Sequence, residues 1–91
     1  MHIQVNDLHV MIEINIKIHQ GFQKYLHEGL TAKRFKRLIP KNSTVGFLLI
    51  DQIGLPKEVP KLMIVNGIHV KLSHILSHED RVAVFFPMAG G

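Results

Sequence analysis

The sequence predicts one small α+β domain in which a mixed sheet of about five strands packs on one main helix. Three observations support this fold class: a strictly alternating apolar segment near the N-terminus, an amphipathic segment with capping residues in the middle, and an Asn-Gly turn signal in the second half. With 91 residues the chain fits a single domain with one modest core.

The first predicted strand covers residues 10–18, where apolar and polar residues alternate and the β-branched side chains share one face. Residues 19–29 form a connector with a short helical turn at 22–26. A second strand is predicted over 31–39, although Arg37 shares a face with the apolar Phe35 and Ile39. Either Arg37 lays its aliphatic stem along the edge of the core, or a bulge shifts the register.

A helix is predicted from Thr44 to Ile53, with capping candidates at Asn42, Ser43 and Thr44. Gly54 is placed to end this helix, and Pro56 prevents its continuation. The apolar residues of the segment form one stripe with helical spacing, consisting of Val45, Leu48, Leu49 and Ile53.

Asn66-Gly67 separates two apolar runs, 61–65 and 68–72, and predicts a hairpin with a type I′ turn. After a turn over 73–80, a last strand is predicted over 81–86, with Val82, Val84 and Phe86 on the core face. The order strand, strand, helix, strand, strand, strand, with a long crossover around the helix, predicts the β-grasp fold.

Composition excludes several classes of function. The chain has no cysteine, which rules out disulfides and thiolate chemistry, and no apolar run approaches the roughly 20 residues that span a membrane. The first residues do not resemble a secretory signal, so we expect a cytoplasmic protein. The net charge is +4, and for the basic cluster at 33–37 we expect a solvated strand face instead of a nucleic acid site.

The histidines and the polar residues predict neither a metal site nor an intrinsic active site. His74 and His78 lie four residues apart, which is a ligand spacing only in a helix, and their segment is predicted to be a turn. No combination of nucleophile and base or of paired carboxylates is recognisable, so we do not expect an enzyme.

Several short motifs in the second half occur in an order that resembles a known family. They are Thr44-Val45, Val65-Asn66-Gly67, Asp80-Arg81-Val82-Ala83, Phe85-Phe86-Pro87 and Ala89-Gly90-Gly91. Together they are similar to the prokaryotic ubiquitin-like sulfur-carrier family, which includes the thiamine-pathway carrier and the small subunit of molybdopterin synthase. The resemblance covers roughly residues 10–91 and leaves residues 1–9 as an extension without an assigned role.

The resemblance implies that the functional group is the C-terminal carboxylate. A partner adenylyltransferase would use ATP and Mg²⁺ to adenylate Gly91, and a sulfur donor would then form a thiocarboxylate for a downstream synthase. No cofactor is expected on the chain itself. Residues 87–91 are expected to be a flexible tail, in which Gly90 has no Cβ and can enter a narrow partner site. The predicted partner-binding residues are Phe85, Phe86, Pro87, Met88 and Ala89.

Two alternative functions remain open at this point. The first is a ubiquitin-like modifier that is joined through Gly91 to lysines of target proteins. The second is a β-grasp binding module with an inert tail.

Two apolar residues of the predicted helix are weaker candidates for partner contacts than Phe85. Phe47 and Ile50 lie off the helical stripe, and we hypothesise that they form a self-association or partner surface; otherwise the sheet edge or the loop over 58–61 covers them. Phe85 is predicted to point away from the core and to contact the activating enzyme, unless a neighbouring side chain covers it.

Overall fold

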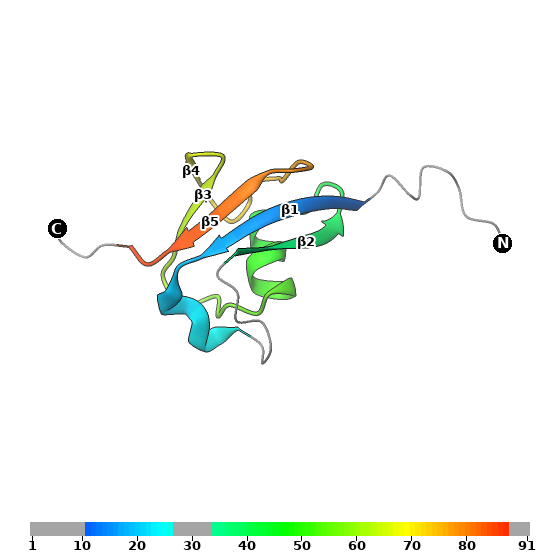
Figure 1. Cartoon of the computed structure of the whole chain (residues 1–91). Helices are drawn as coiled ribbons and strands as arrows, with labels where there is room; N and C mark the ends of the chain where they lie inside the picture. The colour runs from blue at the N-terminus through cyan, green and yellow to red at the C-terminus, as the bar shows by residue number, and fades with distance from the viewer. Residues whose placement is uncertain (1–10, 27–33, 88–91) are drawn as a thin grey trace.

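The computed structural model describes residues 11–26 and 34–87, and in these ranges five strands form one sheet (Figure 1). The sheet order is β2-β1-β5-β3-β4, with β1 and β5 parallel and the other neighbours antiparallel. This arrangement confirms the predicted mixed sheet. The strands are β1 (Met11–Ile18), β2 (Arg34–Pro40), β3 (Leu62–Val65), β4 (Ile68–Val70) and β5 (Arg81–Phe85).

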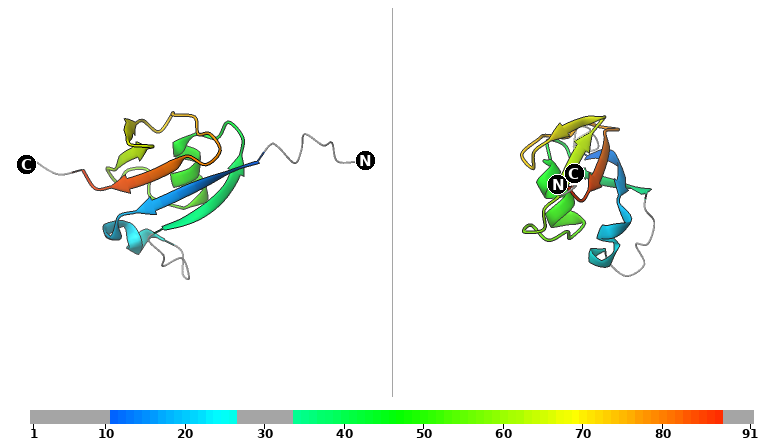
Figure 2. Two further views of the ribbon diagram at one scale, coloured as in Figure 1. Left: turned by 45° about the horizontal axis from the view of Figure 1, so that its top comes forward. Right: turned by 90° about the vertical axis from the view of Figure 1, so that its left-hand side faces the viewer.

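The core lies between the sheet and the helix η3 (Phe47–Gln52), which packs against one face (Figure 2). Every second residue of β1 is buried as predicted, namely Ile12, Ile14, Ile16 and Ile18. The described residues leave the opposite face of the sheet uncovered by a helix. We call this opposite face the outer face.

The predicted middle helix is present, but most of it is a π-helix instead of an α-helix. After a single α-helical turn at 45–46, η3 is a π-helix in which the N–H of Ile53 donates to the carbonyl of Leu48, five residues earlier, at 3.0 Å. The wider turn places Ile53 next to both Leu48 and Leu49, and all three side chains are fully buried. Packing of these residues against the sheet therefore favours the π pattern.

The predicted helix ends are confirmed by hydrogen bonding and backbone angles. The Thr44 hydroxyl accepts a hydrogen bond from the N–H of Phe47 at 3.1 Å, which is the geometry of an N-cap. Gly54 has a φ of 93°, which ends the helix in a conformation that favours glycine.

The hairpin turn is also confirmed, because Asn66 and Gly67 have positive φ values of 51° and 85°. However, β4 ends at Val70, two residues earlier than predicted. The chain beyond it leaves β3 and pairs with the start of the helix, where the N–H of Gly46 donates to the Leu72 carbonyl at 2.9 Å.

The edge strand β2 pairs with β1 in one unbroken register, from Met11 opposite Pro40 to Lys17 opposite Arg34. No bulge is therefore present, and Arg37 lies half-buried on the core side with its guanidinium carbon 6.0 Å from the centre of the Phe35 ring. The predicted start of this strand, residues 31–33, lies outside the described residues.

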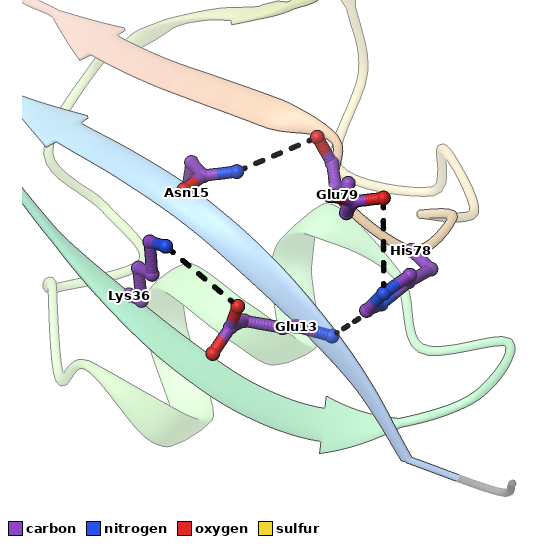
Figure 3. Close-up of polar contacts among 5 residues, drawn as sticks. All are labelled: Glu13, Asn15, Lys36, His78 and Glu79. Carbon is purple, nitrogen blue, oxygen red and sulfur yellow. Dashed lines mark hydrogen bonds and ion pairs between the residues drawn. The ribbon is translucent and has the colours of Figure 1, made fainter.

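The turn before β5 is fastened to β1 by three hydrogen bonds from backbone N–H groups, of which Figure 3 shows the one between Glu13 and His78. The N–H of Glu79 donates to the Glu13 carbonyl at 2.7 Å, and the N–H of Glu13 donates to Nδ1 of His78 at 3.0 Å. The N–H of Asn15 donates to the Asp80 carbonyl at 2.9 Å. These bonds align the start of β5 with β1, so the last strand enters the middle of the sheet in a defined register.

Candidate functional site

The last described residues, Phe86 and Pro87, follow β5, which is the central strand of the sheet (Figure 1). β5 is hydrogen-bonded to β1 on one side and to β3 on the other. Its core-facing residues Val82 and Val84 are at most 1% exposed. Because both neighbours and the core hold this strand, the direction of the chain at Phe85 is fixed.

β5 ends at Phe85, one residue earlier than predicted, because its partner strands stop there. Phe85 lies opposite Leu62, the first residue of β3. On the other side, the N–H of His19 donates to the Val84 carbonyl at 3.0 Å, just beyond the end of β1. Phe86 is consequently held by its side chain and not by the sheet.

The Phe86 ring packs flat on Phe22, with ring centres 4.0 Å apart and an angle of 13° between the planes. Phe22 belongs to the 3₁₀-helix η2 (Gln20–Tyr25) and is fully buried, so it provides a rigid support. Gly21 leaves space for the ring: a Cβ at this position would lie 2.7 Å from Cδ2 of Phe86 and closer still to Cε2. Any larger residue at position 21 would have to move the ring.

His19 contacts both phenylalanines at the end of β5. Its ring centre lies 6.1 Å from that of Phe85 and 6.4 Å from that of Phe86, the latter edge to face. Its Nδ1 accepts a hydrogen bond from the N–H of Gly21 at 3.2 Å. We call His19, Gly21 and Phe22 the tail platform, because they surround the Phe86 ring near the end of the described residues.

The tail platform was not among the residues predicted from the sequence. The helical turn containing Phe22 was expected and is present as η2, but the contact between Phe22 and Phe86 joins residues that are far apart in the sequence. Local periodicity carries no information about such a contact. The only signal in the sequence for this contact was Gly21 directly before Phe22, a small residue beside an aromatic one in the connector.

The predicted partner-binding residues separate into two groups. Phe85 is half-buried on the outer face beside Leu62, and Pro87 is exposed. The predicted residues Met88, Ala89, Gly90 and Gly91, and with them most of the predicted tail, lie outside the described residues. Phe47 and Ile50 are half-buried on η3, on the opposite side of the sheet from Phe85, and Phe47 packs against the core. The two groups therefore do not form one surface.

Lys61 holds the turn that precedes β3, beside the end of β5. Its ammonium group donates to the carbonyl of Pro56 at 2.8 Å and to that of Val59. Burial lowers the pKa of Lys61, and the nearby Glu58 carboxylate opposes this change. Because its donors are used by backbone carbonyls, Lys61 acts as a structural cation at this position.

Within residues 11–26 and 34–87, no group of three or more His, Asp or Glu side chains is arranged to hold a metal ion. His78 already uses Nδ1 as the acceptor for the Glu13 N–H, and its segment is not helical. In the same ranges, no helix has the length and apolar character needed to cross a membrane.

Several solved structures share this fold. The crystal structure of SAMP1 from Haloferax volcanii has a TM-score of 0.65 and 17% identity, and the match covers 87% of this chain and 99% of that one. The solution structure of the HVO 2177 protein of the same organism has a TM-score of 0.70 and 22% identity, covering 90% and 89% of the two chains. A Pyrococcus furiosus protein described as molybdopterin converting factor subunit 1 has a TM-score of 0.66 and 19% identity, covering 85% and 99%.

These likenesses establish the fold, and a sequence family model establishes the family. No sequence among the curated proteins matches the chain significantly. The model of the family described as Mut7-C ubiquitin matches residues 11–90, which is most of the chain and contains both β5 and the tail platform. The resemblance to ubiquitin-like carrier proteins is thereby confirmed, and the chain belongs to the Mut7-C ubiquitin family.

Proposed function

We propose that this protein is a sulfur carrier whose Gly91 carboxylate is adenylated by a partner enzyme and then converted to a thiocarboxylate. The observation that supports this most is the tail platform, which holds Phe86 on a fully buried ring, with only Pro87, Met88 and Ala89 between Phe86 and Gly90-Gly91. A rigid support at the base of the C-terminal segment is what a carrier needs in order to present its last residue to a partner.

The chemistry requires activation, because a carboxylate is a poor acyl donor. In the proposed first step, a Gly91 carboxylate oxygen attacks the α-phosphorus of ATP and pyrophosphate leaves. In the second step, a hydrosulfide-level sulfur from the donor attacks the acyl carbon and AMP leaves. The chain itself supplies only the acyl group, so the absence of cysteine from the sequence is compatible with this role.

The test is the mass of the protein purified from its own host, with the variant lacking Gly91 as control. A carrier is expected to show a fraction that is heavier by the difference between one sulfur and one oxygen atom, and the deletion variant should not. A further mass increase by one alkyl group on treatment with an alkylating reagent, seen only in the heavier fraction and not in the deletion variant, would identify the group as a thiocarboxylate. A protein that stays unmodified when its host's adenylyltransferases and ATP are supplied would refute the proposal.

A second candidate is a protein modifier that is joined through Gly91 to lysines of its targets. The likeness to a structure titled small archaeal modifier protein 1 favours it, with a TM-score of 0.63 and 15% identity. Both functions use the same activation at Gly91, so they differ in the product. Because Arg81 is the last basic residue, host proteins digested with trypsin would carry residues 82–91 on the modified lysine if the protein is a modifier, whereas a free thiocarboxylate would support the carrier.

A further inference from the structure

The outer face of the sheet contains a groove that is basic on one side and apolar on the other. Its volume is about 540 Å³, and residues from β1, β2, β3 and β5 line it. It lies on the face opposite η3, and its function is not explained by chemistry at Gly91. The residues used below are Lys17, Arg34, Lys36 and Arg81 on the basic side, and Ile64 and Ala83 on the apolar side.

The strand register brings the four cations together. Lys17 lies directly opposite Arg34, while Asn15 lies between Lys36 on one neighbouring strand and Arg81 on the other. All four basic side chains are exposed. Figure 3 shows Asn15 and Lys36 on the near side of β1 and β2, with η3 behind the strands.

This positive charge is only partly neutralised by the described residues. Glu13 forms an ion pair with Lys36, with 3.9 Å between Nζ and Oε1. Among the described residues, no carboxylate oxygen lies within 4.0 Å of the Lys17, Arg34 or Arg81 side chains. Like charges directly opposite each other on neighbouring strands are unfavourable, so an anionic partner at Lys17 and Arg34 would remove a repulsion already present in the sheet.

The other side of the groove is apolar and continues toward the end of β5. Ala83 lies opposite Ile64, and one pair further along, Phe85 lies opposite Leu62 on the same face. All four side chains are half-buried, so each retains apolar surface that a partner can cover.

We propose that this groove, defined by Lys17, Arg34, Lys36, Arg81, Ile64 and Ala83, binds an amphipathic acidic segment of a partner protein. The acidic side of the segment lies over the basic residues of β1 and β2 and over Arg81 at the start of β5, and its apolar side lies over Ala83 of β5 and Ile64 of β3. RNA fits less well, because the apolar side would meet no complementary group and the one aromatic residue that lines the groove, Phe35, packs its ring against the core. The proposal goes beyond the proposed function and applies equally to a carrier and to a modifier.

The experiment uses the full chain and a synthetic helical peptide with glutamates along one face and leucines along the other. A peptide of the same composition in scrambled order and a poly(U) RNA are the comparison ligands. Calorimetry measures the dissociation constants, and backbone amide shifts locate the contact. We expect the amphipathic peptide to bind more tightly than the scrambled one and to shift the amides of Ile64, Ala83 and Lys17.

Two double variants separate the groove from general charge effects. Lys17→Glu with Arg34→Glu should weaken peptide binding about tenfold or more at low salt. The matched control, Lys57→Glu with Lys71→Glu, changes the net charge equally at exposed positions outside the groove and should have little effect. Circular dichroism checks that every variant is folded.

Three outcomes would overturn the proposal: equal affinity for the ordered and scrambled peptides, equal weakening by both double variants, or tighter binding of poly(U) than of the amphipathic peptide. None of these outcomes depends on modification of Gly91. The groove and the proposed function can therefore fail independently.

Discussion

Replacing Gly21 by alanine should displace the Phe86 ring from the tail platform while the protein remains folded. The added Cβ would lie 2.7 Å from Cδ2 of Phe86, so the ring must leave its position on Phe22. Losing this stacked pair costs about 0.5–1.5 kcal/mol beyond the area that is exposed. Gly21 does not have the positive φ that would strain alanine, and an unstrained Gly→Ala change stabilises by about 0.4–1 kcal/mol. The gain from Gly→Ala offsets much of the lost stacking, but the apolar area exposed on the two rings adds to the cost, so stability should fall by about 1–3 kcal/mol while the fold persists.

The effect on activation should be larger than the effect on stability. With Phe86 displaced, the residues before Gly90-Gly91 start from a different position, and adenylation by the partner should slow. Pyrophosphate exchange measures adenylation, and nuclear Overhauser contacts between the Phe22 and Phe86 rings report the displacement. Gly46→Ala is the control, because its Cβ would meet only Leu72 among the residues beyond its own turn.

Two results would contradict this reasoning. The first is that Gly21→Ala retains the ring contacts between Phe22 and Phe86, which would show that the glycine is not needed for the stack. The second is that the contacts are lost while adenylation keeps its wild-type rate, which would show that the platform does not position the tail. Restoration of activation by a smaller residue in Gly21→Ala, Phe86→Leu would support the steric explanation.

Three further predictions concern the residues around β5. Asn66→Ala removes the acceptor at 2.9 Å from the Arg81 N–H, and denaturant unfolding should show a loss of about 1–3 kcal/mol. Lys61→Met tests the lowered pKa of Lys61. Just below the ordinary pKa of 10.5, the unfolded chain binds more protons at Lys61 than the folded protein does, so the stability of the wild type rises with pH in this range. Thermal unfolding should show this rise lost in Lys61→Met and retained in Lys57→Met; an unchanged profile in Lys61→Met would contradict it. Phe85→Ala should slow adenylation while circular dichroism shows an intact fold, and unchanged kinetics would refute its role in docking.

Much of the fold could be predicted because it depends on local patterns. Alternation from Ile12 to Ile18 places one face of β1 in the core whatever the rest of the chain does. Asn66-Gly67 specifies its turn because these residues tolerate positive φ, and Thr44 and Gly54 mark the helix ends for similarly local reasons. Each signal acts within a few residues, so no tertiary contact is needed to recognise it.

Only the tertiary structure decided the π-helical pattern of η3, the early ends of β4 and β5, the tail platform and the two-sided groove. Each depends on residues far apart in the chain, such as Phe22 with Phe86 or Lys17 with Arg34 and Ala83. The terminal Gly-Gly was visible in the sequence by itself, because a motif needs no partner to be recognised. The tail platform that supports it could not be predicted, because packing contacts form between residues that come together only after folding.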